Sequence, residues 1–137
     1  RALGNNRAIN RHVWDSVELD RLIENAESDT AKVLCGLTEM LSIRKHQPAF
    51  HPNATQYTLH LGSGLFAFWR QSRSRHQSIF CIHNITNQIK TFSLTDLNLI
   101  ETHQWKDLLS DTAYLEFDAK VSLSPYQCMW LTNFWPK

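Results

Sequence analysis

The residues able to do chemistry are spread along this chain and do not form a recognisable catalytic set. The seven histidines include no pair at the four-residue spacing that places two metal ligands on one helix face. A zinc site needs about four ligands in one place, so we expect no metal site. The chain also has neither a glycine-rich phosphate loop nor a G-x-S-x-G turn that would expose a nucleophilic serine.

The acidic residues also favour structural roles. Many of them fall on or beside two segments with helical periodicity, between Asp15 and Asp29. A glycosidase needs two carboxylates that converge on one bond from rigid supports, and a surface helix does not offer that arrangement. We therefore expect no catalytic residue and no cofactor within this sequence.

Composition excludes several classes of partner. The 14 basic and 13 acidic residues leave a net charge of +1, which gives no electrostatic reason to bind nucleic acid or an anionic membrane. No apolar stretch approaches the roughly 20 residues that span a bilayer. The cysteines, Cys35, Cys81 and Cys128, are odd in number and lie in apolar runs, which predicts reduced thiols and a cytoplasmic location.

Two helices are predicted in the first third of the chain. Apolar residues recur at helical spacing from Ser16 to Ala26, with Ser16 as a possible N-cap. Ser28 and Asp29 offer a second cap before a longer apolar stripe over Val33–Ile43, and Pro48 ends the helical region. Such a stripe must cover an apolar surface, which we expect to include a partner missing from this chain.

The pattern changes to a period of two after Pro52, which predicts an all-β unit. Seven or eight short strands are expected, with a turn signal every 8–12 residues, typical of a sandwich or Greek-key barrel. They are expected at residues 57–61, 65–71, 78–83, 89–94, 105–109, 114–117, 121–123 and 126–132. The predicted domains are residues 1–47 and 48–137.

The five tryptophans allow another function, because sugar-binding modules present flat aromatic faces to pyranose rings. Trp69 and Trp130 fall on predicted strands and should pack inside, whereas Trp105 and Trp135 are harder to place. An independent carbohydrate-binding sandwich is therefore an alternative, and an interaction domain with an exposed helical face is a third.

Several segments resemble one enzyme family. Residues 6–12, NRAINRH, resemble the G-R-x-I-N-R-H loop of sucrose phosphorylases and their relatives in glycoside hydrolase family 13, with departures at Asn6 and Ala8. Residues 44–54, RKHQPAFHPNA, resemble the barrel-to-sandwich junction of the branch that includes sucrose 6-phosphate and glucosylglycerate phosphorylases. Further similarity covers residues 68–72, 80–84, 105–109 and 124–131.

The resemblance implies an α+β fragment: two helices from the end of a (β/α)8 barrel, followed by an all-β Greek-key sandwich of the amylase C-terminal type. Residues 1–14 would then form the loop after the eighth barrel strand, on the active-site face. The family's donor-subsite arginine matches Arg7, while Asn10 and Arg11 would shape the loop.

The resemblance also implies a parent enzyme that transfers glucose with retention. Its catalytic acids would lie upstream of Arg1, in an N-terminal barrel that is the expected partner of this chain. The intact enzyme would bind a sugar substrate and phosphate, and the fragment alone would be inactive. A chain that begins with Arg rather than Met fits the same expectation.

Overall fold

The structure is a computed structural model that describes residues 13–97, 104–116 and 118–133. In these ranges the chain forms two α-helices, then eight short strands with two 3-10 helices among them. It divides into two compact units, residues 1–41 and 42–137. No helix in the described ranges is long and apolar enough to cross a membrane.

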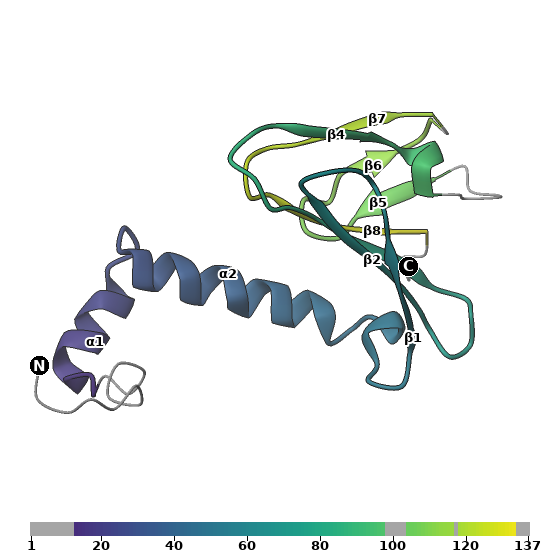
Figure 1. The fold of residues 1–137 in the computed structure, drawn as a ribbon. Helices are drawn as coiled ribbons and strands as arrows, with labels where there is room; N and C mark the ends of the chain where they lie inside the picture. The colour runs from purple at the N-terminus through teal and green to yellow at the C-terminus, as the bar shows by residue number, and fades with distance from the viewer. Residues whose placement is uncertain (1–12, 98–103, 117, 134–137) are drawn as a thin grey trace, which may run out of the picture. The chain divides into compact units, whose positions relative to one another are not determined.

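The helices are α1 (Ser16–Glu24) and α2 (Asp29–Arg44), which follow each other at the purple-to-blue end of the ribbon (Figure 1). The N-cap of α1 is Asp15 and not Ser16, because the Asp15 carboxylate accepts a hydrogen bond from the Glu18 amide at 3.0 Å. Its negative charge also suits the positive end of the helix dipole. Ser28 caps α2 as expected, with its Oγ 3.0 Å from the Ala31 nitrogen.

Neither helix buries a side chain in the described structure. Four apolar residues on one side of α2 are between 47% and 61% exposed: Val33, Leu34, Leu37 and Leu41. Their spacing of three and four residues places them on a single helix face. This face is the stripe that the sequence indicates, and the described chain leaves it uncovered.

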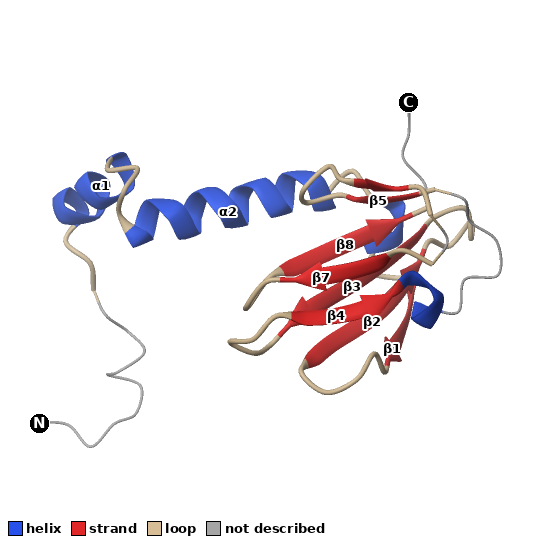
Figure 2. Cartoon of the chain, turned by 90° about the horizontal axis from the view of Figure 1, so that it is seen from above, coloured by secondary structure: helices blue, strands red, loops and turns tan. Residues whose placement is uncertain are grey.

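The β unit consists of two antiparallel sheets (Figure 2). The larger sheet has the order β1 (Thr55–Leu59), β2 (Leu65–Gln71), β3 (Ser78–Asn84), β8 (Cys128–Thr132), β5 (Trp105–Asp107) and β6 (Ala113–Tyr114). The smaller sheet pairs β4 (Lys90–Ser93) with β7 (Lys120–Leu123). The short helices η2 (Pro48–Phe50) and η3 (Leu94–Leu97) precede β1 and follow β4.

The predicted fold class is confirmed, since two helices precede an antiparallel β domain of two sheets. Four strands are shorter than expected, and β4 and β5 each lose two residues. The strand predicted at 114–117 is only two residues long, and the last strand begins at Cys128 and not Tyr126. Tyr126 has a φ of 59°, and its amide donates to the Thr86 carbonyl, so this residue forms a turn and not extended backbone.

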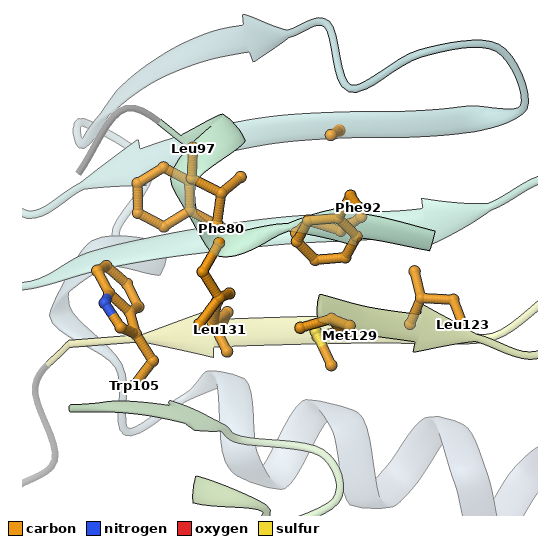
Figure 3. Packing of buried hydrophobic residues seen from close by; sticks show 11 residues of the cluster. Phe80, Phe92, Leu97, Trp105, Leu123, Met129 and Leu131 are labelled. Atoms are coloured by element: carbon orange, nitrogen blue, oxygen red, sulfur yellow. The ribbon is translucent and has the colours of Figure 1, made fainter. Parts of the chain in front are cut away.

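The core lies between the two sheets (Figure 3). The larger sheet contributes Phe80, Ile82, Met129 and Leu131, which alternate with outward residues along β3 and β8. The smaller sheet and η3 contribute Phe92, Leu94, Leu97, Val121 and Leu123. Trp105 of β5 closes the core at one end, with its ring centroid 5.3 Å from that of Phe80.

Leu131 is fully buried on a strand with neighbours on both sides, so its truncation should leave a cavity. Leu131→Ala should lower the free energy of unfolding by about 2–5 kcal/mol. Urea unfolding followed by tryptophan fluorescence measures this change. Leu115→Ala is the control, because Leu115 is exposed and its loss should cost no more than about 0.5 kcal/mol. Equal effects of the two substitutions would contradict the core described here.

Candidate functional site

The substrate-binding residue predicted from the sequence, Arg7, lies outside the described residues, as do the loop-shaping Asn10 and Arg11. Their roles therefore stay predictions. Within the described ranges, no group of three or more histidine, cysteine, aspartate or glutamate side chains is arranged to hold a metal ion.

An open hollow of about 360 Å³ lies at the start of the β unit. It is formed by one continuous segment, the end of α2 and the residues that lead into β1. Basic and imidazole side chains line much of it, and none of its lining residues is acidic: Arg44, Lys45, His46, Gln47, Pro48, Phe50, His51 and Pro52. This segment coincides with the RKHQPAFHPNA motif.

Two side chains of the β2–β3 hairpin hold this junction segment in place. Gln77 is 1% exposed; its Oε1 accepts from the Ala49 amide at 2.9 Å and its Nε2 donates to Gln47 Oε1 at 2.6 Å. Arg70 donates from Nε to the Ala49 carbonyl and from Nη2 to the His51 carbonyl, at 2.9 and 2.8 Å. The bonds to Ala49 pair both backbone groups of this buried residue, while the His51 carbonyl also accepts from the Ala54 amide.

Apolar contact completes the junction. Phe50 is buried against Trp130 of β8, with ring centroids 4.8 Å apart. The Arg44 guanidinium lies 5.9 Å from the centre of the Phe50 ring, a cation–π distance. The arginine that borders the hollow is therefore also part of the packing around η2.

A second chemically notable cluster lies on β3 and β8. His83 Nδ1 is 3.1 Å from Cys128 Sγ, and Cys81 lies nearby on the same face. Burial raises the pKa of the Cys81 thiol to about 12, and it raises the pKa of Cys128 and lowers that of His83. Both shifts favour a neutral thiol beside a neutral imidazole, the opposite of the thiolate–imidazolium pair of a cysteine nucleophile.

The aromatic rings that could serve a sugar platform are mostly interior. Trp105 and Trp130 are buried, and Trp69 stacks between Tyr57 and Phe80 at centroid distances of 5.3 and 6.0 Å. Trp69 thus packs inside as expected and Trp105 joins it, whereas Trp130 is buried on the outer face of the larger sheet, against Phe50. Trp135 lies outside the described residues.

The acids that the structure describes have structural roles wherever a contact is given. Asp15 caps α1, and Glu27 forms an exposed ion pair with Lys32 at 3.2 Å. Asp107, which is buried, accepts hydrogen bonds from the Trp130 amide and the Ser110 hydroxyl. These contacts give Asp15, Glu27 and Asp107 structural roles.

Comparison with known proteins supports the family resemblance. The chain is 30% identical over 127 residues to a glucosylglycerate phosphorylase of Allomeiothermus silvanus, covering 93% of this chain and 20% of that protein. It is 25% identical over 129 residues to a glucosylglycerate phosphorylase of Escherichia coli K12, covering 94% of this chain and 22% of that protein. The chain thus spans about a fifth of the length of these relatives. No family model matches it.

Solved structures support the fold. AmyP in complex with maltose superposes with a TM-score of 0.65 at 15% identity, over 77% of this chain and 21% of that one. An Anoxybacillus α-amylase superposes with a TM-score of 0.63 at 17% sequence identity. This match covers 79% of the present chain and 23% of the amylase chain. The family resemblance expected from the motifs is confirmed by the sequence relatives, and the solved structures agree with it in fold.

The junction depends on the buried Gln77 side chain. Gln77→Ala should lower the free energy of unfolding by about 1–3 kcal/mol, because it leaves the Ala49 amide without its buried acceptor. Gln56→Ala removes the same kind of side chain at an exposed position, where it accepts from Arg70, and should cost less than about 0.5 kcal/mol. Chemical denaturation measures both, and a Gln77 effect no larger than that of Gln56 would contradict this account.

The lowered pKa of His83 predicts a pH-dependent stability. Above the ordinary histidine pKa of 6.5 the imidazole is neutral in both states and costs nothing. As pH falls through 6.5 the unfolded chain takes up a proton that the folded chain resists, so stability falls until the folded-state pKa is passed. Urea midpoints between about pH 7.5 and about pH 5.5 should fall less in His83→Leu than in the wild type. His76→Leu controls for the substitution at an exposed site; an unchanged slope in His83→Leu would refute the prediction.

Proposed function

We propose that this chain is the C-terminal part of a retaining, glucosyl-transferring sugar phosphorylase. The chain is similar over nearly its whole length to glucosylglycerate phosphorylases of glycoside hydrolase family 13. The observation that carries the proposal is the alignment with two such enzymes over 93% and 94% of this chain. The substrate class is a glucoside such as glucosylglycerate, sucrose or a phosphorylated sucrose.

The chemistry of the parent enzyme would follow the retaining mechanism. One carboxylate attacks the anomeric carbon and forms a covalent glucosyl intermediate, while a second carboxyl protonates the departing alcohol. Phosphate then attacks that intermediate, releases the first carboxylate and yields glucose 1-phosphate. In the proposed enzyme both groups would belong to an N-terminal barrel.

The exposed helix faces support this division of labour. Val33, Leu37 and Leu41 are apolar, on one face of α2 and more than half exposed. Burying each such side chain contributes about 1.5–3 kcal/mol, so covering them with a barrel would bind the two parts together strongly. The chain would then stabilise the barrel and add one arginine to its donor subsite. Its three free cysteines favour a cytoplasmic enzyme.

The alternative of an independent carbohydrate-binding sandwich has weaker support. Trp105 and Trp130 are buried and Trp69 is enclosed between other rings, so these faces are not free to stack on a pyranose. The similarity to amylases bound to sugars concerns the fold alone.

The role of Arg7 can be tested in the longer enzyme. Arg7→Lys should lower kcat/KM for phosphorolysis of glucosylglycerate at least about tenfold, because an ammonium cannot reproduce the planar fork of a guanidinium. Arg73→Lys, in an exposed hairpin, is the matched control and should leave kcat/KM unchanged. Glucose 1-phosphate release, followed by a coupled assay, measures both.

Two outcomes would contradict the proposal. Release of glucose 1-phosphate by the 137-residue chain alone would show that its catalytic groups lie within it. Wild-type kinetics in Arg7→Lys would remove the arginine from the donor subsite while leaving the family assignment intact.

A further inference from the structure

The outward face of the larger sheet carries an aromatic patch formed by Phe66, Phe68, His83 and Cys128. These residues alternate along their strands with Ala67, Ile82 and Met129, which point into the core. The strand register places Phe66 opposite His83 and His83 opposite Cys128. The three strands β2, β3 and β8 lie side by side, so the patch is continuous across them (Figure 2).

The rings of the patch contact one another, and Phe68 and His83 are half-buried. Phe66 is 52% exposed, and its ring centroid lies 5.8 Å from that of Phe68 and 6.0 Å from that of His83. Phe68 and His83 stack at 5.9 Å with their planes 20° apart. The one polar pair, His83 and Cys128, is satisfied internally. The surface therefore offers flat apolar area with few free hydrogen-bonding groups.

The other half of the same face is already covered by this chain. Ile79, Cys81 and Trp130 are buried there, with Phe50 of η2 packed on Trp130 and Ala49 bonded to Arg70. The outward face thus carries apolar residues on β2, β3 and β8 beside the polar Arg70, and η2 covers only one part of it. A face built in this way is suited to burial over its remaining area as well.

We propose that the aromatic patch is a contact surface for the catalytic part of the longer enzyme, and this inference rests on the function proposed above. The relatives extend over about five times the length of this chain, which supplies an occupant of ample size. The patch contains no lysine, arginine or carboxylate, so its partner is an apolar protein surface and not a nucleic acid or a charged sugar. It is a second attachment point, separate in sequence from the apolar face of α2.

The test compares one substitution in two proteins, the 137-residue chain and the protein encoded with its upstream sequence. Phe66→Ser should leave the melting temperature of the short chain nearly unchanged. In the long protein the same substitution should lower the melting temperature by at least about 2 °C more than it does in the short chain. Leu115→Ser is the matched control, since Leu115 is apolar and 68% exposed but lies beside β6. It should have equal effects in both proteins.

Hydroxyl-radical footprinting gives a second readout that does not depend on stability. The modification rate of Phe66 should fall severalfold in the long protein, while that of Leu115 should not. Equal Phe66 rates in both proteins would overturn the proposal. The proposal would also be overturned if Phe66 were protected in the short chain, increasingly so at higher protein concentration, but not in the long protein. That result would assign the patch to a contact with a second copy of the chain.

A phosphorylase assay on the same long protein separates this inference from the proposed function. Protection of Phe66 without release of glucose 1-phosphate would support the contact surface and refute the reaction. Phosphorylase activity with an unprotected Phe66 would refute the contact surface alone.

Discussion

The pairing of β3 with β8 is the constraint on which the rest of the β unit depends. It joins residues about 50 positions apart in sequence and sets the register that points Phe80, Ile82, Met129 and Leu131 into one core. A slip of one residue would turn this set outward and expose it. The same register fixes what the other face presents, because Trp130 and the His83–Cys128 pair are the outward residues of these strands.

Trp130 in turn provides the surface on which the junction segment packs. Phe50 lies on its ring, Gln77 and Arg70 hold the backbone from Gln47 to His51, and Arg44 lies over the outer side of Phe50. Several positions of the RKHQPAFHPNA motif are thereby explained by packing and hydrogen bonding. A motif that marks the family resemblance acts here as the connection between helix and sandwich, and its basic residues need no catalytic role.

The chain has two exposed surfaces rich in apolar residues, one on α2 and one on the larger sheet, and both suit contact with a partner. The stripe on α2 consists of apolar side chains at helical spacing, and the patch on the larger sheet has Phe66 and Phe68 beside the His83–Cys128 pair. Isolated exposed leucines are ordinary, whereas contiguous apolar faces mark surfaces meant for contact. A chain that spans about a fifth of its relatives has an evident source for such contacts. The proposed barrel accounts for both faces without assigning a separate activity to this chain.

Local pattern was enough to determine the elements of this protein. The helical spacing from Val17 to Ile43, the stop at Pro48 and the alternation after Pro52 predicted two helices and then a sandwich, because side-chain periodicity follows backbone geometry. The motifs indicated the family resemblance, which the sequence relatives confirm. Strand ends were less predictable. Tyr126 was expected to begin the last strand, but it adopts a positive φ and belongs to the turn before that strand. Tertiary structure alone decided that Gln77 supports Ala49, that Phe50 meets Trp130, and that His83 and Cys128 are adjacent. Those contacts join residues 28 to 80 positions apart, and their geometry follows from strand register and chain folding, which no local pattern encodes.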